Sequence, residues 1–462
     1  MVTYDCNCKD VIITEGIFGE IYAESAEEIR SYDSKDYHEN AENKEFRLMP
    51  VKSYTMINKN RLEITVISWG ATIVSLKYPD KFGYVTDVVL GFDDLKSYTN
   101  PKINPFIGCI LGRCANRIKD SSIIIKGKTY ELTKNDFGKH HLHGGTKGFG
   151  RQLWESYIDG CSVVMTYLSK DGEEGYPGAV LSTVRFRLMP DNILEIGIRA
   201  TTTNSTIVNI SHGSLFNLAG HDAGKKELMK HKISLNCDRW TFADYTDPIP
   251  TGSIRGVGGT IMDLRVPKFL ESYIVNLRKL QVPPGEGYDH NFCVTPNWHG
   301  GNTYVAQAVH PQSGRVLEIY SNQPGVQFYT GGRLCSTSET ESNLADAYDS
   351  PNHEKEYEEK KAVDEIKQDV APEGESQEFI SGKQGARYVK HCAFSIQPQN
   401  YPNAINYVSS KATKILHCFL LHSLQVKLIL FQSHFPCSIL RPGEVYCHDL
   451  IYKFGIQLAN YM

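Results

Sequence analysis

Short runs in which apolar and polar side chains alternate recur along this chain of 462 residues. Alternation with a period of two is typical of β-strands that bury one face, and examples are RLEITVISWG (61–70), ATIVSLKYPD (71–80), SSIIIKGKTYEL (121–132), AVLSTVRFRL (179–188) and RVLEIYS (315–321). Turn signals such as Lys170-Asp171-Gly172 and Ser313-Gly314 separate these runs. Because connections this short join antiparallel strands, the sequence predicts an all-β protein built from stacked antiparallel sheets.

Charge and composition argue against several function classes. The formal net charge is −4, from 49 basic and 53 acidic residues, and no Lys/Arg-rich block indicates a nucleic-acid partner. The stretch MVTYDCNCKDVIITEGIFGE carries Asp5, Lys9 and Asp10 where a secretory signal needs an apolar core, and no uncharged apolar run reaches the roughly 18 residues of a membrane span. The 12 cysteines lack zinc-like spacing, so we expect free thiols, no metal site and a cytoplasmic location.

Three segments interrupt the strand pattern. Residues 21–45 are polar and acidic, so residues 1–46 read as an N-terminal segment that is largely a polar insert, and residues 47–462 as a single β-sandwich domain. Residues 337–384 contain 14 Asp/Glu and five Lys, a composition that cannot bury enough apolar surface to offset chain ordering, so we expect a disordered acidic insert. Residues 408–433 are unusually apolar. They are interpreted either as an amphipathic membrane or partner helix or as a retained in-frame intron.

Ten short motifs then appear in a fixed order between about residue 55 and residue 456. They are ISWG (67–70), DVVLGF (87–92), GRCANRI (112–118), LHGG with GF (142–149), DGEEGYPG (171–178), FNLAG (216–220), YDHNF (288–292), QPGVQFYTG (323–331), QNYPNA (399–404) and LRPG (440–443). In this order the set resembles the aldose 1-epimerase (galactose mutarotase) family, and the three odd segments fall between motifs, as insertions do.

The resemblance implies both a fold and a reaction. The fold is a galactose-mutarotase-like β-supersandwich of large curved antiparallel sheets, as a monomer or weak dimer, with no metal and no organic cofactor. The reaction interconverts the α and β anomers of hexoses such as galactose or glucose. A base removes the proton of the anomeric hydroxyl while an acid protonates the ring oxygen, and each such group is typically worth a factor of about 10²–10⁴.

The resemblance also assigns residues to the sugar site. Asn116 and Arg117 match the family's GRxANRI motif, His143 matches the histidine of LHGG, and Asp289 and Gln327 match an aspartate and a glutamine that hold sugar hydroxyls. A guanidinium fork donates to vicinal hydroxyls, which suits Arg117. Phe149 and Trp154, which could line the site, are expected to belong to the core instead.

This chain departs from the family at the acid. Aligning VNISHGSLFNLAG (208–220) without a gap places Gly213 where the family has its catalytic histidine. His212 stands one position earlier, and neighbouring side chains of an extended strand point to opposite faces. We therefore expect His212 to pack or hydrogen-bond behind the site, unless the backbone twists at Gly213 and lets His212 act as the acid.

The base has changed as well. The run FSIQPQNYP (394–402) carries Gln397 where the family has its catalytic glutamate, and an amide has no useful basicity at neutral pH. The leading hypothesis is therefore a hexose-binding pseudoenzyme with weak or no catalysis. The alternative is an active aldose 1-epimerase that uses His143 or His212 as the acid and Asp289 as the base. A third hypothesis is a chain whose fold is compromised by residues 408–433.

Overall fold

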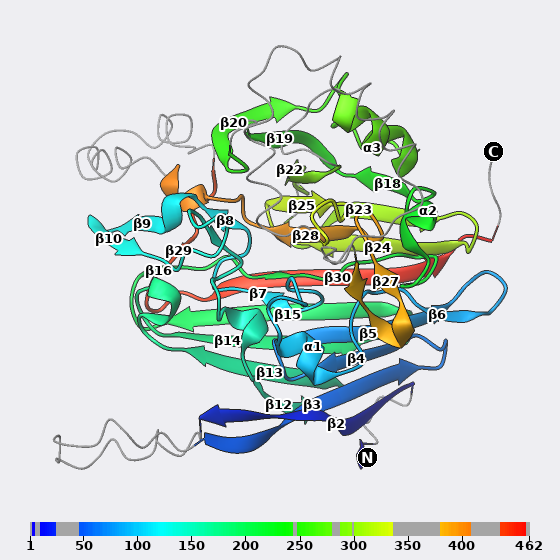
Figure 1. Ribbon diagram of the computed structural model, residues 1–462, viewed down its shortest axis with the longest axis horizontal. Coiled ribbons are helices and arrows are strands. Elements are labelled where there is room, and N and C mark those ends of the chain that lie inside the picture. The colour runs from blue at the N-terminus through cyan, green and yellow to red at the C-terminus, as the bar shows by residue number, and fades with distance from the viewer. Residues whose placement is uncertain are drawn as a thin grey trace, which may run out of the picture.

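The computed structural model describes residues 2–4, 10–24, 46–243, 247–279, 287–297, 300–335, 379–407 and 435–458. Its strands form three large antiparallel sheets and several two-stranded ladders (Figure 1). The expected all-β, antiparallel architecture is confirmed. Among the residues described, no helix is long and apolar enough to cross a membrane.

A six-stranded sheet holds the N-terminal part of the chain. In spatial order its strands are β1 (Val2–Tyr4), β2 (Val11–Glu24), β3 (Phe46–Asn58), β4 (Glu63–Ile67), β5 (Thr72–Pro79) and β6 (Val85–Asp87). Sequence order equals spatial order, so each strand pairs with the next one along the chain.

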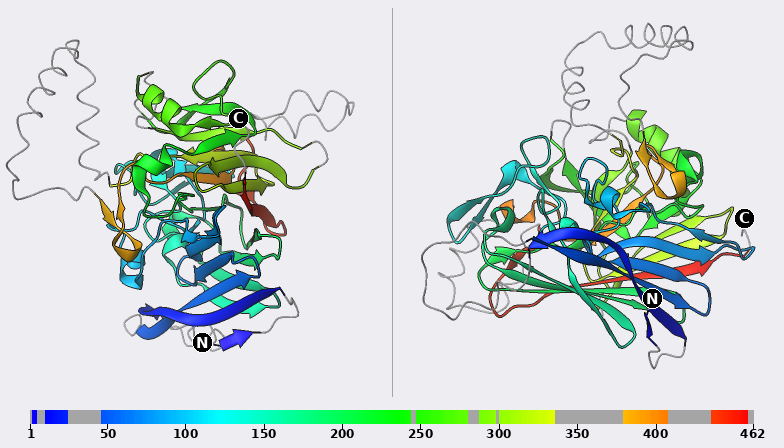
Figure 2. Two further views of the ribbon diagram at one scale, coloured as in Figure 1. Left: turned by 90° about the vertical axis from the view of Figure 1, so that its right-hand side faces the viewer. Right: turned by 60° about the horizontal axis from the view of Figure 1, so that its bottom comes forward.

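A nine-stranded sheet crosses the width of the molecule. Its spatial order is β12 (Glu155–Asp159), β13 (Ser162–Ser169), β14 (Val180–Leu188), β15 (Ile193–Thr202), β30 (Tyr446–Ile456), β24 (Arg315–Ser321), β23 (Thr303–His310), β18 (Lys232–Leu235) and β21 (Lys268–Phe269). The last strand of the chain, β30, lies between β15 and β24 and joins the two halves of the sheet. Figure 2 shows the six-stranded sheet beside β12–β15, and the hydroxyls of Tyr54 and Ser156 lie 3.1 Å apart where the two sheets meet.

A five-stranded sheet lies above β30 in Figure 1. Its order is β20 (Pro250–Gly256), β19 (Cys237–Ala243), β22 (Asp289–Val294), β25 (Gly325–Tyr329) and β28 (Ser395–Gln399). Pro398 belongs to β28, which is an edge strand of this sheet. Proline has no backbone N–H to donate to a neighbouring strand, so it destabilises a sheet least when it lies in an edge strand.

Short elements connect the sheets. The ladders are β9 (Ser122–Ile125) with β10 (Lys128–Glu131), β8 (Arg117–Ile118) with β11 (His141–Leu142), β16 (Thr206–Ile207) with β29 (Ile439–Leu440), β7 (Ile110–Leu111) with β17 (Ser211–His212), and β26 (Ile380–Ser381) with β27 (Arg387–Tyr388). The α-helices are α1 (Leu95–Thr99), α2 (Gly224–Leu228) and α3 (Leu270–Lys279). Single 3-10 turns are η2 (Lys119–Ser121), η3 (Phe149–Arg151), η4 (Glu173–Gly175), η5 (Lys383–Gly385) and η6 (Ala404–Asn406).

The sequence alternation produces the core. Along β14 the side chains alternate between buried and partly or fully exposed, and along β15 the same alternation holds. The register brings Phe186 opposite Ile196 and Ile319 opposite Tyr452, and all four are at most 1% exposed. One face of the nine-stranded sheet is therefore apolar, and it packs against the other two sheets.

Two of the segments predicted from composition, the N-terminal polar segment and the acidic insert, include residues that belong to strands of the fold. Strand β2, part of the N-terminal segment read as largely a polar insert, pairs with β3 along its length and buries Val11 and Ile13 at 4% and 0% exposure. Residues 379–384, read as the end of the acidic insert, hold β26 and Lys383. The Lys383 ammonium lies 2.6 Å from an Asp87 carboxylate oxygen in a nearly buried ion pair, which fixes this stretch. Residues 25–45, 336–378 and 408–434, which hold the rest of the three odd segments, lie outside the described residues.

The cysteines differ from expectation at one position. Cys109, Cys114, Cys237, Cys293, Cys335, Cys392, Cys437 and Cys447 are free. Cys161, in the turn between β12 and β13, is disulfide-bonded. The expectation of free thiols throughout is therefore wrong at Cys161.

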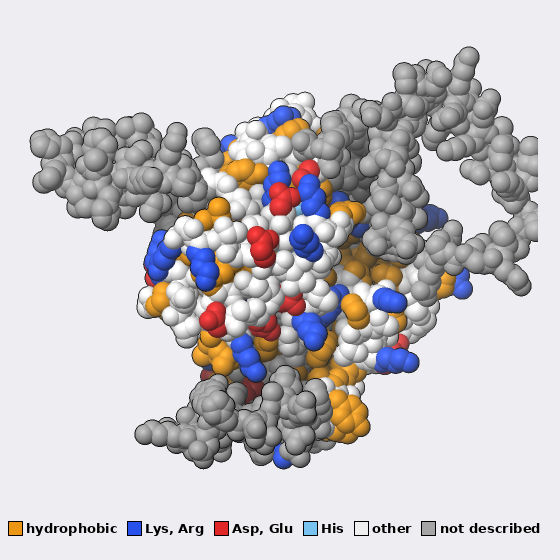
Figure 3. Space-filling model, turned by 60° about the vertical axis from the view of Figure 1, so that its left-hand side comes forward, with side chains coloured by type: hydrophobic (Ala, Val, Ile, Leu, Met, Phe, Trp, Pro, Cys, Tyr) orange, Lys and Arg blue, Asp and Glu red, His pale blue; other side chains and the backbone are white. Residues whose placement is uncertain are grey.

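The surface carries no block of one charge sign on the face that Figure 3 shows. Basic and acidic side chains are interspersed there, with apolar side chains between them.

Candidate functional site

Asn116 and His143 are held against each other at the ends of two short strands. Asn116 precedes β8 and His143 follows β11, and both have a positive φ, 65° and 53°. The Asn116 backbone N–H donates to His143 Nδ1 at 3.1 Å, and the His143 backbone N–H donates to the Asn116 carbonyl at 3.2 Å. The chain turns sharply next to them because Gly144 has no Cβ, which would lie 1.7 Å from the Gly112 carbonyl oxygen.

These contacts define the protonation state of His143. Because Nδ1 accepts a hydrogen bond, the neutral ring carries its proton on Nε2. Burial lowers the pKa of His143 to about 3, and the positive charge of Arg117 acts in the same direction. At neutral pH the imidazole is therefore uncharged and presents one N–H donor. The ring of Phe106 lies beside it, with the centroids 5.3 Å apart.

Arg117 links this ladder to the five-stranded sheet. Its Nε lies 2.8 Å from Asp136 Oδ2, and its Nη1 lies 3.7 Å from Asp289 Oδ2. The Arg117 and Asp136 side chains are only 7% and 10% exposed. A guanidinium buried to this degree needs such partners, because an unpaired buried charge is strongly destabilising. No sequence motif marked Asp136, which lies in the turn before β11.

Asp289 begins β22 and is surrounded by donors. Gln327 Nε2 donates to Asp289 Oδ1 at 2.6 Å, and Arg333 Nε lies 3.7 Å from Asp289 Oδ2. Burial alone would raise the pKa of Asp289, but the charges of Arg117 and Arg333 and the Gln327 hydrogen bond lower it overall. The carboxylate therefore stays ionised at neutral pH, as an acceptor for hydroxyl groups rather than as a proton-seeking base.

Asp289, Gln327 and Gln397 lie on one face of the five-stranded sheet. Asn291 pairs with Gln327 and Gln327 pairs with Gln397, and directly opposed residues share a face. Gln397 is 9% exposed, and its Nε2 donates to Ser395 Oγ at 3.0 Å. Position 397 thus holds a neutral amide, and one of its N–H donors is engaged within the same strand.

The same face carries several buried amide atoms that make no hydrogen bond with the described residues. They are Asn291 Oδ1, Gln327 Oε1 and both polar atoms of Gln399. Buried polar groups in proteins are nearly always paired, with protein, water or ligand. This face therefore carries amide groups whose hydrogen-bonding capacity the described residues do not use.

The side chain of His212 points away from these groups. In β17 the Ser211 hydroxyl donates to the Pro398 carbonyl at 2.8 Å, whereas His212 turns toward β30, where its Nδ1 lies 3.3 Å from the Tyr452 hydroxyl. His212 is fully buried, and burial lowers its pKa to about 3, opposed by a hydrogen bond with the Gly108 backbone. The structure brings Asn116, Arg117, His143, Asp289 and Gln327 together, and it places His212 in the core.

Phe149 and Trp154 also belong to the core, as expected. They are 1% and 2% exposed, and Trp154 Nε1 donates to the Phe149 carbonyl at 3.0 Å. The only donor of the indole is therefore used within the core, and neither ring lines the site.

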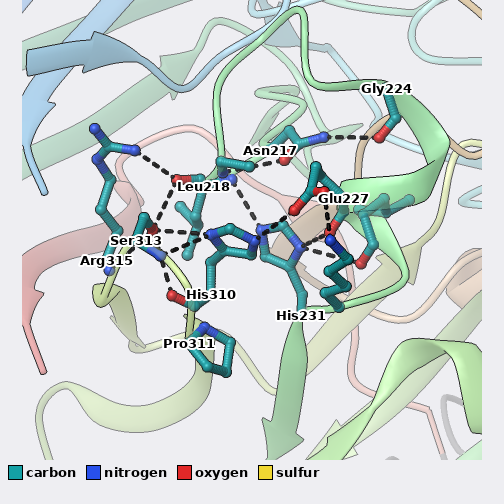
Figure 4. Close-up of polar contacts among 12 residues, drawn as sticks. Asn217, Leu218, Gly224, Glu227, His231, His310, Pro311, Ser313 and Arg315 are labelled. Carbon is teal, nitrogen blue, oxygen red and sulfur yellow. Dashed lines mark hydrogen bonds and ion pairs between the residues drawn. The ribbon is translucent and has the colours of Figure 1, made fainter. Parts of the chain in front are cut away.

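A second polar cluster lies at the hairpin between β23 and β24 (Figure 4). His310 Nδ1 lies 2.9 Å from Ser313 Oγ, and His310 Nε2 lies 3.2 Å from Glu227 Oε2. The neighbouring His231 accepts from the Leu218 backbone N–H at 2.9 Å. Because these groups bond to backbone and to one another, the cluster fastens α2 and the FNLAG loop to the hairpin. The described residues include no group of three or more His, Cys, Asp or Glu placed to hold a metal ion.

The fold and site together define a class, namely all-β proteins of the galactose mutarotase-like fold whose site is built from amide, guanidinium, imidazole and carboxylate groups. The family model for aldose 1-epimerase matches residues 52–417. The chain belongs to the aldose 1-epimerase family.

Known proteins agree with this assignment. The galactose mutarotase of Bos taurus is 34% identical over 404 residues, which covers 87% of this chain and 93% of the relative. That of Homo sapiens is 32% identical with the same coverage. Among solved structures, the GalM/aldose epimerase homologue from C. elegans has a TM-score of 0.64 and 25% identity over 86% of this chain and 97% of that one. A galactose 1-epimerase from Lactobacillus acidophilus, 18% identical, shares the fold with a TM-score of 0.59, covering 95% and 99%.

Proposed function

We propose that this chain binds hexoses such as galactose or glucose at the site formed by Asn116, Arg117, His143, Asp289 and Gln327, and that it interconverts their anomers weakly or not at all. The observation that carries the proposal is the neutral, locally bonded amide of Gln397 on a face that still offers hydroxyl-binding groups. The sugar-holding residues are retained while the position of the base has lost its basicity.

The acid is missing as well. Gly213 has no side chain, and His212 is directed at Tyr452 on the opposite side of its strand. Ring opening needs a proton removed at the anomeric hydroxyl and another delivered at the ring oxygen. Losing both groups removes several kcal/mol of transition-state stabilisation, although groups that act as a unit are not additive.

The alternative, an active epimerase with Asp289 as the base, is opposed by the surroundings of that carboxylate. Two guanidinium groups lie 3.7 Å from its Oδ2, and the pKa of Asp289 is lowered rather than raised. A general base works best with a pKa near the operating pH, so Asp289 is better suited to hold a hydroxyl than to remove a proton.

Polarimetry and calorimetry on the same preparation test the proposal. Freshly dissolved α-galactose is followed with and without the full chain, and galactose binding is titrated in parallel. We expect binding without acceleration above the spontaneous rate. Asp289→Asn should weaken binding roughly tenfold or more, because hydrogen bonds to charged groups are worth about 1.5–3 kcal/mol. The matched control is Asp159→Asn, on the outer edge of the nine-stranded sheet, which should bind as the parent does.

Two results would contradict the proposal. Acceleration comparable to that of an active epimerase would show that the acid and base have been replaced elsewhere, and loss of that rate in Asp289→Asn would identify Asp289 as the base. A folded chain that binds neither galactose nor glucose would remove the sugar site altogether.

A further inference from the structure

Arg333 stands at the rim of the site and was not singled out by any motif. It follows β25, and its backbone N–H donates to the Tyr329 hydroxyl at 2.9 Å. Its guanidinium lies over the ring of Phe137, 5.5 Å from the centroid, and its side chain is 26% exposed. The Phe137 ring is itself unusually exposed, at 44%. Arg333 and Phe137 therefore form one edge of the site that is open to solvent.

The guanidinium of Arg333 makes no hydrogen bond with the described residues. Its ion-pair partner is Asp289 Oδ2, and the 3.7 Å separation from Nε is too long for a hydrogen bond. Asp289 Oδ1 accepts a hydrogen bond from Gln327 at 2.6 Å, and Asp289 Oδ2 lies 3.7 Å from Arg117 Nη1 as well as from Arg333. As far as the described residues go, the forked N–H donors of Arg333 are left to bind a ligand.

The local charge balance permits a negative ligand. The charged side chains that meet at Asp289 are Arg117 and Arg333 on one side and Asp136 and Asp289 on the other, so they cancel. A glutamate at position 397 would add a negative charge and repel an anion, whereas Gln397 adds none. The amide at this position therefore removes a barrier to an anionic sugar as well as a catalytic base.

We propose that the site accepts a hexose carrying an anionic group, a carboxylate or a phosphate, and that Arg333 is the residue that selects it. The proposal rests on the proposed hexose site and goes beyond it by naming the chemical class of the sugar. A planar guanidinium pairs with both oxygens of a carboxylate or phosphate at once, and such charge-assisted bonds are about twice as strong as neutral ones.

Calorimetric titration of the full-length chain with galactose, galacturonate and galactose 6-phosphate tests this. We expect at least one anionic sugar to bind roughly tenfold more tightly than galactose, at an ionic strength of about 0.02 M, and the advantage to shrink with added salt. The carboxylate and phosphate arms identify which anion is preferred. Arg333→Met should bring the anionic and neutral sugars to within about twofold of each other, and Arg333→Lys should retain part of the preference.

The matched control is Arg255→Met. Arg255 also lies over an aromatic ring, that of Phe242, but it shares a face with Trp240 and Phe292 and so lies on the other side of the five-stranded sheet from Asp289. It should leave all three affinities unchanged. Thermal melts of each variant establish that it is folded. The comparison of the three sugars on the wild-type chain tests the anion preference even if a variant fails to fold.

The outcomes separate this inference from the proposed function. If galactose binds at least as tightly as both anionic sugars, the inference fails and the hexose site stands. If an anionic preference persists in Arg333→Met, Arg333 is not the selecting residue and the inference fails. If no sugar binds to the folded chain, both proposals fail.

Discussion

Gly213 occupies a position with no room for a side chain. A Cβ there would lie 2.9 Å from the Phe106 carbonyl oxygen and 3.3 Å from that of Cys109, and the Gly213 backbone is hydrogen-bonded to Cys109 and Gly108. Moving a carbonyl oxygen that is held by a backbone hydrogen bond would cost free energy, because that bond would be weakened. A side chain at position 213 would therefore require the surrounding backbone to shift.

We predict that Gly213→Ala lowers the free energy of unfolding by about 1–3 kcal/mol, the usual effect of overpacking a tight site. Urea unfolding measures it. Gly197→Ala is the matched control, because Gly197 lies in β15 and a Cβ there would meet nothing within 4 Å. That variant should be neutral or slightly more stable. Equal behaviour of the two variants would show that position 213 can take a side chain, and Gly213→His with Gln397→Glu would then be worth testing for recovered mutarotation.

At the residue scale, the motifs predicted residues that the structure brings together, and they gave no signal for neighbouring residues outside the motifs. Asn116, His143 and Gln327 were found because each belongs to a motif with flanking glycines or strand residues. Asp136 and Arg333 were missed because their roles arise only when Asp289 and Arg117, far apart in the chain, come within 3.7 Å of each other. A single charged residue in a turn carries no local signal of that contact.

At the scale of elements, buried neutral histidines tie loops and strands to the nine-stranded sheet. His231 bonds the FNLAG loop beside α2, with its ring 4.8 Å from that of His310 (Figure 4). His448 of β30 bonds the Ile210 carbonyl at 2.8 Å. Burial lowers the pKa of His231 to about 3 and that of His448 to about 4, with smaller opposing effects from backbone hydrogen bonds.

We predict that acidification destabilises the fold below about pH 6.5. The unfolded chain protonates these histidines near 6.5, whereas the folded chain resists protonation until about pH 3–4. Between those values the unfolded state binds more protons, so stability is full above 6.5 and falls as the pH drops. Each histidine contributes up to about 1.4 kcal/mol per pH unit.

Urea midpoints between about pH 7.5 and 5 measure this dependence. His231→Gln should give a shallower dependence, whatever its own cost at neutral pH, because it removes one of the titrating groups. A midpoint that stays constant or rises on acidification would refute the assignment of these histidines as neutral in the folded state.

Element by element, strands lie where the alternation is strongest, as in β14 and β24, which fall on the runs 179–188 and 315–321. Two-residue pairs such as β7 with β17 and β8 with β11 could not be predicted, since two residues carry no periodicity. These short pairs are what positions Gly213 and His143. The boundary at residue 384 was misplaced for a related reason, because Lys383 reads as a surface charge until its partner Asp87 is known.

At the scale of the whole molecule, the two ends of the segment 408–434 meet. The rings of Tyr407 and Phe435 lie 4.8 Å apart, and Phe435 is 1% exposed. Phe435 also packs on Tyr401, at 5.3 Å between centroids, next to the Asn400 side chain, which donates to the Pro436 carbonyl at 3.1 Å. The described residues on the two sides of this segment therefore contact each other directly.

We predict that deleting residues 408–433, so that His434 alone bridges Tyr407 and Phe435, leaves a cooperatively folded protein with a Tm within about 4 °C of the full chain. Loop length has a weak effect, about 0.6 kcal/mol for each doubling, and shortening a loop lowers the closure cost. Differential scanning calorimetry of both forms measures it. Phe435→Ala in the shortened form should cost about 3–5 kcal/mol, because the aromatic contact then holds the junction. An aggregated or non-cooperative shortened form would instead show that residues 408–433 supply packing that the fold requires, which an insertion of intron origin would not do.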